Sequence, residues 1–214
     1  MQEEGVIKFD LRFSAGEAVS LEPFRELNSW RSRLWQLALI GQDPERYLGY
    51  GFGNVSQRLD TAVNDGNMTP FLISGTQTGG LPELGAAHYA LVTACDVMQN
   101  RVEARGPVQP SSESLTHGMV YAQSGDIRVV LHVHSPDIWL AADRLGLPFT
   151  DAAVEYGTPA MALEVDRLFR ETDVMEQKIF SMGGHEDGVV AFGATAAAAG
   201  AVLTETLSRC RNIN

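Results

Sequence analysis

The chain has 214 residues, 44% of them hydrophobic and 20% charged, a balance that fits one globular domain with a sizeable core. Its formal net charge of −11, with no cluster of Lys and Arg, argues against a nucleic-acid partner and against an anionic membrane surface. Two cysteines, Cys95 and Cys210, are too few for a disulfide framework and lie in no metal-ligand spacing. Because the sequence also shows no signal-peptide pattern and no apolar run of about 18 residues, we expect a cytoplasmic protein without a membrane span.

The first half of the chain combines short strands with one helix. Apolar residues recur at helical spacing over residues 23–40, and Gly41 is expected to end that helix. A glycine-rich turn over residues 49–54 leads into a strand. Further strands are expected over residues 6–13, 71–76 and 89–97.

The second half is richer in helices. A helix is expected to start in Pro110-Ser111-Ser112-Glu113, with Ser111 or Ser112 as N-cap and Glu113 in the first turn, where the helix dipole favours an anion. Further helices are expected over residues 137–145, 158–170 and 195–209, and strands over residues 178–182 and 189–192. Since several strands follow one another without a helical crossover, we expect an α/β fold with a mixed sheet covered by helices.

A His-x-His pair, His132 and His134, stands at the end of a run of β-branched and aliphatic residues over 127–133, which predicts a buried strand. Side chains at positions i and i+2 of a strand point to the same face, so the two imidazoles converge. Such a pair is typical of a site for a divalent metal ion. A structural, hydrogen-bonded pair is the alternative that so short a motif leaves open.

A metal site of this kind needs at least a third protein ligand, and the chain has five histidines. His185 follows two glycines at a strand end, and glycine lets the backbone approach a bound group closely. His117 lies one turn after Glu113, where a structural hydrogen bond explains it, and His88 fits no site. His185 is therefore the candidate third ligand, with an ordinary turn histidine as the alternative.

Three histidines that leave one position open would make the metal a Lewis acid able to polarise a carbonyl or to stabilise an enediolate. That chemistry needs a proton carrier close to the metal. Glu113 is the candidate, because it stands at the start of a helix. A plain acidic residue at a helix start is the alternative.

Three segments offer hydrogen-bond donors that could bind a phosphate: the turn with Gly53 and Asn54, the loop with Thr76, and the helix start with Ser111 and Ser112. Each of these features is common by itself. A nucleotide has no support, because the chain has no Walker A lysine motif and no GxGxxG after its first strand.

Taken in order, these segments resemble the class II aldolase/adducin family, from about Leu27 to Leu207. The matching segments are Gly53-Asn54-Val55-Ser56 with Arg58, Ile73-Ser74-Gly75-Thr76, Pro110-Ser111-Ser112-Glu113 with His117 and Tyr121, His132-Val133-His134-Ser135-Pro136, and His185 with Gly188. The most specific part is the Pro-Ser-Ser-Glu segment, followed about twenty residues later by His-Val-His-Ser-Pro.

The resemblance implies a three-layer α/β/α sandwich around a central mixed, largely antiparallel sheet. It implies one such domain over residues 21–214 after an N-terminal extension over residues 1–20, assembled as a homotetramer. In the sugar-phosphate aldolases of this family, the residues matching His132, His134 and His185 bind zinc, and the one matching Glu113 moves protons at the enediolate. The substrate phosphate is bound by residues matching Gly53, Asn54, Thr76, Ser111 and Ser112.

We therefore expect a metal-dependent lyase with one divalent ion, zinc by expectation, that cleaves a small ketose-phosphate-like substrate by retro-aldol chemistry. A sugar-phosphate dehydratase of the methylthioribulose-phosphate type and a non-catalytic assembly module, as in adducin, are the alternatives. The related pentulose-phosphate epimerases carry Asp where this chain has Glu113, which argues against that activity.

Three departures from the family pattern concern the site itself. Thr76 is followed by Gln77 instead of the usual glycine, which could crowd or replace a phosphate contact. Glu186 and Asp187 stand between His185 and the glycine that normally follows it directly. No residue matches the tyrosine that protonates the leaving aldehyde in the aldolases.

Overall fold

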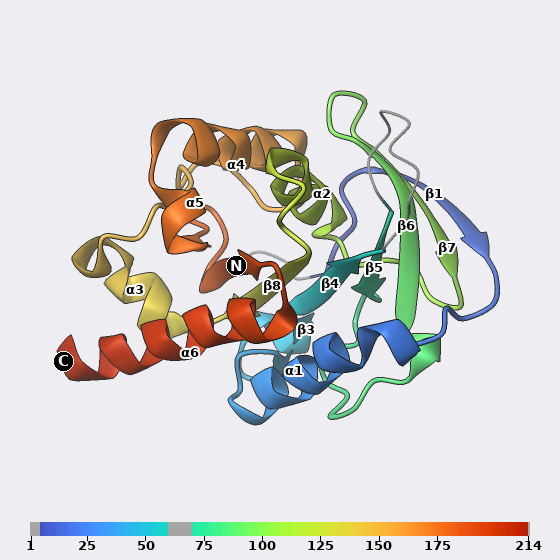
Figure 1. The fold of residues 1–214 in the computed structure, drawn as a ribbon, viewed down its shortest axis with the longest axis horizontal. Coiled ribbons are helices and arrows are strands. Elements are labelled where there is room, and N and C mark those ends of the chain that lie inside the picture. Colours follow the sequence, from blue (N-terminus) through green and yellow to red (C-terminus); the bar gives the residue numbers. More distant parts are fainter. Residues whose placement is uncertain (1–4, 60–69, 214) are drawn as a thin grey trace.

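The computed structural model describes residues 5–59 and 70–213, which form a central sheet with helices on both faces (Figure 1). The sheet has eight strands. In spatial order they are β1 (Asp10–Ala15), β7 (Arg101–Gly106), β6 (Tyr89–Asp96), β5 (Phe71–Ser74), β4 (Asn54–Arg58), β8 (Val129–His134), β10 (Gly188–Gly193) and β9 (Ile179–Ser181). Neighbouring strands pair antiparallel except β1 and β7, which are parallel, so the expected mixed, largely antiparallel sheet is confirmed.

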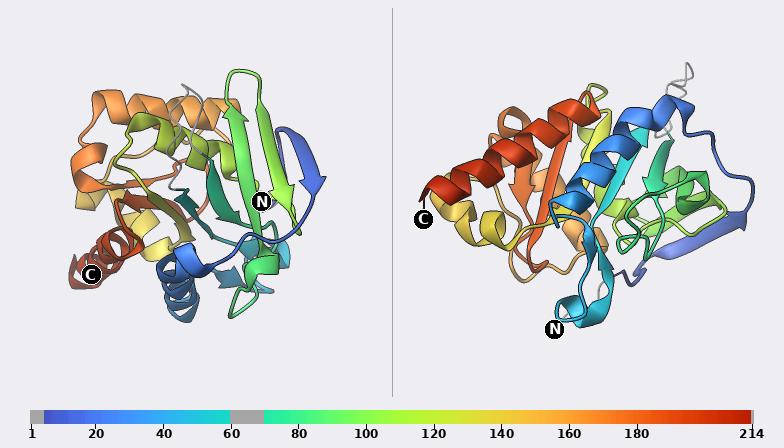
Figure 2. Two further views of the ribbon diagram at one scale, coloured as in Figure 1. Left: turned by 45° about the vertical axis from the view of Figure 1, so that its right-hand side comes forward. Right: turned by 90° about the horizontal axis from the view of Figure 1, so that it is seen from below.

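Two groups of helices complete a three-layer sandwich. One group comprises α1 (Arg25–Gln36), α3 (Pro136–Leu145) and α6 (Ala196–Ile213). The other comprises α2 (Ser114–Gln123), α4 (Pro159–Glu171) and the short α5 (Val174–Gln177). Figure 1 shows α1 and α6 below the sheet and α2 and α4 above it, and Figure 2 shows the same layers from two further sides. The expected α/β/α architecture is confirmed.

The alternation of side chains along β8 gives each face of the sheet its own core. Leu131 and Val133 pack with α1, α3 and α6, whereas Val130 packs with α2 and α4. His132 and His134 share the side of Val130, because successive side chains of a strand point to opposite faces. The strand therefore presents both histidines to the layer in which α2 begins.

The sheet ends on one side in two strands that sequence periodicity did not place correctly. β7 was missed because its buried positions hold only Val102, Ala104 and Gly106, with charged residues at the other positions. β1 begins at Asp10 rather than at residue 6 and pairs in parallel along β7. Part of the segment expected as an N-terminal extension is thus the edge strand of the sheet.

A small hairpin, β2 (Gly41–Gln42) and β3 (Gly51–Phe52), precedes β4, and its loop contains the 3-10 turn η2 (Tyr47–Gly49). Two more 3-10 turns, η1 (Glu22–Phe24) and η3 (Ala86–His88), precede α1 and β6. Within residues 5–59 and 70–213 no helix has the length and apolar character to cross a membrane.

Two expected helix boundaries were wrong. α1 ends at Gln36 instead of near Gly41, because Ala38 adopts a left-handed φ of 56° that a helix cannot continue through. α2 begins at Ser114 with Glu113 itself at the N-cap position, so neither expected serine caps the helix. The carbonyl oxygen of Ser111 instead accepts hydrogen bonds from the backbone N–H (3.1 Å) and the hydroxyl (2.6 Å) of Ser114.

Candidate active site

Three buried histidines meet where β8 ends and the turn before β10 passes it. His134 lies opposite Gly188 in the pairing of β8 with β10, which brings the turn that carries His185 alongside. One ring nitrogen from each of His132, His134 and His185 lies within 4.8 Å of the other two. Two nitrogens bound to one tetrahedral ion through bonds of about 2.1 Å lie about 3.4 Å apart, so the three rings would move closer together to share an ion.

The protonation states of His132 and His134 are compatible with binding of a cation. Burial lowers the pKa values of His132 and His134 well below the ordinary range, and the nearby His185 lowers them further. Both rings are therefore neutral, and a neutral imidazole is the form that binds a metal. The Nε2 atom of His132 is buried and has no hydrogen-bond partner among the described residues. A divalent ion would use the lone pair on such an atom.

Asn54 fixes the orientation of the first histidine. It lies opposite His132 in the pairing of β4 with β8, and its Nδ2 atom is 3.1 Å from Nδ1 of His132. The amide oxygen of Asn54 is buried without a hydrogen-bond partner in the described part of the chain. If the amide is turned over, the oxygen accepts from Nδ1–H, which leaves Nε2 of His132 free for a metal. Asn54 can therefore support a metal ligand, a role that the sequence did not indicate.

Glu113 lies beside the histidines at the start of α2. Its side chain is buried, and Oε1 is 3.7 Å from Nδ1 of His185. A carboxyl group held beside the candidate metal ligands can carry protons for a substrate bound there.

One cavity joins Glu113 and His132 to the residues expected to bind phosphate. Its lining contains the five residues that the sequence singled out for this purpose: Gly53, Asn54, Thr76, Ser111 and Ser112. Backbone pairing brings two of the segments together, since Gly75 bridges to Pro110 and the N–H of Thr76 donates to the carbonyl of Gln109. The lining also contains Gln77, Gly51 and Gly5.

The two glycines before His185 serve another purpose than the close approach to a bound group that the sequence suggested. A Cβ on Gly183 would collide with the carbonyl oxygen of Thr150, and one on Gly184 with that of Val154. The glycines therefore leave room for the loop over residues 149–154.

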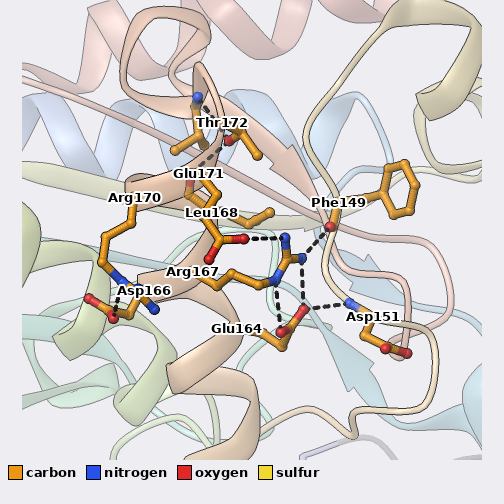
Figure 3. Close-up of polar contacts among 10 residues, drawn as sticks. Phe149, Asp151, Glu164, Asp166, Arg167, Leu168, Arg170, Glu171 and Thr172 are labelled. Atoms are coloured by element: carbon orange, nitrogen blue, oxygen red, sulfur yellow. Dashed lines mark hydrogen bonds and ion pairs between the residues drawn. The ribbon is translucent and has the colours of Figure 1, made fainter.

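Helix α4 holds that loop in place. The carboxylate of Glu164 accepts from the N–H of Asp151 at 2.8 Å and pairs with Arg167 at 2.9 Å, and Arg167 also donates to the carbonyl of Phe149 (Figure 3). The turn that carries His185 is thus supported from α4 through a network of hydrogen bonds.

Two residues that sequence reasoning missed flank His134 and His185. The ring of Tyr47 packs edge-on against His134, with centroids 4.7 Å apart, and its hydroxyl donates to Asp187 at 2.5 Å. Burial and this bond raise the pKa of Tyr47, and Arg46 pairs with the same carboxylate at 3.2 Å. Tyr156 stacks on His185 at 4.3 Å. The sequence held one indication of the contact with Tyr47. Glu186 and Asp187 are inserted before Gly188, and Asp187 accepts the hydrogen bond from Tyr47.

The remaining histidines have structural roles, as expected for His117. Its Nδ1 atom lies 2.6 Å from the hydroxyl of Ser56, which also lies 2.7 Å from that of Tyr121. Burial lowers the pKa of His117 to about 3, so this ring is neutral. Nδ1 of His88 accepts from the N–H of Gly85 at 2.9 Å, away from the cavity.

Comparison with known proteins agrees with this geometry. The sequence pattern of the Class II Aldolase and Adducin N-terminal domain matches residues 45–213, most of the chain. The chain belongs to the class II aldolase and adducin family. The match spans β3 to β10, the three candidate metal ligands and Glu113. No significant match to a curated protein sequence was found.

Solved structures of this family share the fold at low sequence identity. YgbL from Klebsiella pneumoniae is 20% identical with a TM-score of 0.64, and the match covers 91% of this chain and 90% of that one. An L-fuculose 1-phosphate aldolase is 19% identical with a TM-score of 0.64, over 92% and 86% of the two chains. A sugar-phosphate aldolase from Thermotoga maritima is 16% identical with a TM-score of 0.64, over 89% and 92%. Family membership together with three buried histidines supports metal-dependent, aldolase-like chemistry.

Proposed function

We propose that this class II aldolase family member is a metal-dependent lyase that cleaves a small ketose-like substrate by a retro-aldol reaction. The observation that carries the proposal is the convergence of three buried histidines with one buried carboxyl group, that of Glu113, beside a single cavity. His132, His134 and His185 would hold one divalent ion, for which we propose zinc.

A divalent ion in this place would act as a Lewis acid on the substrate carbonyl. When the carbon–carbon bond breaks, a proton leaves the hydroxyl group of the carbon that becomes an aldehyde. A proton must also be returned to the carbon next to the original carbonyl. Glu113 moves that second proton, because it lies beside the histidines and faces the cavity.

The remaining cavity residues would hold the part of the substrate away from the reacting carbonyl. Gly53, Asn54, Thr76, Ser111 and Ser112 offer backbone, amide and hydroxyl groups there. A phosphate group at this place stays a prediction of the sequence, as do the homotetramer and the cytoplasmic location.

A dehydratase of the methylthioribulose-phosphate type is the second candidate, because it uses the same metal and carboxyl group to break a carbon–oxygen bond. One observation favours it: no tyrosine occurs among the described residues that line the cavity. That lining therefore offers no phenol group to take up the proton from the hydroxyl group that becomes the aldehyde. An assembly module without activity, by contrast, has no physical need for three buried histidines grouped beside a buried carboxyl group.

The test compares wild type with Glu113→Gln, each loaded with zinc and, in parallel, with manganese, iron or cobalt. Small ketoses and their phosphate esters are assayed both for released aldehyde and for dehydration. We expect Glu113→Gln to keep its metal and to lower kcat by about 10²- to 10⁴-fold, the usual value of a positioned proton carrier. Glu176→Gln, at an exposed glutamate in the first turn of α5, is the matched control and should keep full activity. A wild-type protein that gives neither product with any of these metals would overturn the proposal.

A further inference from the structure

Gln77 is the unusual member of the loop that follows β5 and lines the cavity. Its φ of 57° lies in the left-handed region, which favours glycine. A glutamine at such a position retains backbone strain that glycine would not have. Its side chain makes a contact that glycine could not: Oε1 accepts a hydrogen bond from the backbone N–H of Gly51 at 3.0 Å.

The same loop meets the N-terminal segment of the chain. The hydroxyl of Thr76 donates to the carbonyl oxygen of Gly5 at 3.4 Å. The amide nitrogen of Gln77 lies so close to Gly5 that a Cβ on this glycine would collide with it. Two donors that an anion would need, the N–H of Gly51 and the hydroxyl of Thr76, are therefore already bonded to oxygen acceptors of the chain itself.

The charges around the cavity agree with this arrangement. Neither Lys nor Arg occurs among the described residues that line it, and its one acidic residue is Glu113. Without a cation in the lining, a phosphate would depend on hydrogen-bond donors alone, and carbonyl oxygens would repel it. A hydroxyl group, by contrast, can donate to such an oxygen and accept from a neighbouring amide or hydroxyl.

We propose that Gln77 is a specificity-determining residue that selects a neutral, hydroxyl-bearing end of the substrate over a phosphate ester. The substrate class is then a small unphosphorylated hydroxyketone, an assignment that rests on the lyase function proposed above.

Gln77→Gly tests the proposal directly, because glycine adopts this φ without strain and frees the N–H of Gly51. Metal-loaded proteins are titrated with inorganic phosphate in a calorimeter. We expect Gln77→Gly to bind phosphate at least about tenfold more tightly than wild type, the value of one hydrogen bond to a charged group. Gln77→Ala should also bind phosphate more tightly than wild type. Ala38→Gly, which relieves the same left-handed φ at an exposed residue, should gain nothing.

A second variant locates the bound phosphate. If it occupies the cavity beside Gly51, adding Ser111→Ala to Gln77→Gly should cancel the gain, whereas phosphate held by the metal would be insensitive to Ser111. Wild type that binds phosphate as tightly as Gln77→Gly, or a gain that survives Ser111→Ala, would overturn the proposal.

Turnover separates this inference from the lyase function. Dihydroxyacetone and its phosphate ester, each with the same small aldehyde as acceptor, are compared as substrates of the reverse, condensing reaction. We expect wild type to have the higher kcat/KM for the unphosphorylated ketone and Gln77→Gly to shift the ratio towards the ester. If wild type had an equal or higher kcat/KM for the ester, the proposed selectivity would be overturned but the lyase function would not. The phosphate titrations need no turnover, so they decide the role of Gln77 even if the lyase function fails.

Discussion

The cavity has two parts that are built differently. The histidine part rests on paired strands, because Asn54 lies opposite His132 and Gly188 opposite His134 in the sheet register. The other part is assembled from separate loops, which the contact of Gln77 with Gly51 joins. Strand register holds the reactive groups in place, whereas the loops decide which substrate fits against them. The family shares its fold at identities near 20%, so the loop part is where one member can differ from another.

The largest effect on the histidine part of the cavity is expected from a change in the glycines that precede His185. In Gly184→Ala the new Cβ would collide with the carbonyl oxygen of Val154. We expect the free energy of unfolding to fall by about 3 kcal/mol, because backbone must move to admit the methyl group. Urea unfolding of the metal-free protein measures this loss. Gly125→Ala, where the added atom meets open space, should stay close to wild type, and equal losses in the two variants would contradict the account.

Asn54→Ala tests whether the strand register orients a metal ligand. The variant removes the amide that holds Nδ1 of His132. We expect the affinity for zinc to fall by about 10- to 100-fold, the usual effect of losing such a supporting group. Competition with a chromogenic chelator measures the affinity. The control is Gln57→Ala, a half-exposed residue of the same strand, and the assignment of Asn54 fails if both variants bind zinc equally well.

These two variants concern the part of the molecule that could be predicted from sequence most completely. The alternation in a buried strand places His132 and His134 on one face whatever the rest of the chain does. The identity of the third ligand needed only a choice among three further histidines. The sequence singled out Asn54 as a phosphate contact but did not indicate its contact with His132, because a partner across the sheet depends on register, which the spacing of residues along the chain does not reveal.

Tyr47→Phe examines the contact between the hairpin loop and the turn that carries His185. The variant keeps the ring against His134 but removes the hydrogen bond to Asp187. We expect a loss of about 1.5 kcal/mol in the free energy of unfolding, since the lost bond is to a carboxylate, and faster release of zinc. Urea unfolding measures the loss of stability, and stopped-flow mixing with a chelator measures the rate of zinc release. Tyr50→Phe, a more exposed tyrosine of the same loop, should change neither quantity.

The last prediction concerns pH and His117, whose pKa burial lowers to about 3. The unfolded chain takes up a proton on this ring below about pH 6.5, whereas the folded protein does so only near pH 3. The stability that neutral His117 provides is therefore complete above pH 6.5 and is lost as the pH falls towards 3. In this window His117→Gln should reduce the slope of the free energy of unfolding against pH by on the order of 1 kcal/mol per pH unit. Urea unfolding at several pH values measures it, and an unchanged slope would contradict the prediction.

The loops and helix starts were the part that sequence could not predict. Gln77 was visible as a departure from the family pattern, but its contacts depend on where the turn with Gly51 and the segment with Gly5 meet it. Tyr47 and Asp187 lie far apart in the sequence and meet because the hairpin loop folds over the turn before β10. The N-cap of α2 was misplaced because Ser111 turns its carbonyl, not its hydroxyl, towards Ser114.

The central claim is that His132, His134 and His185 together hold one divalent metal ion. Elemental analysis of purified wild type beside His132→Ala tests it most directly, with His88→Ala as a control at a histidine outside the cavity. We predict about one zinc or other divalent ion per chain in wild type and in His88→Ala, and none in His132→Ala. A wild type that stays metal-free after exposure to zinc, manganese, iron and cobalt, or a His132→Ala variant that keeps its full metal content, would contradict the account.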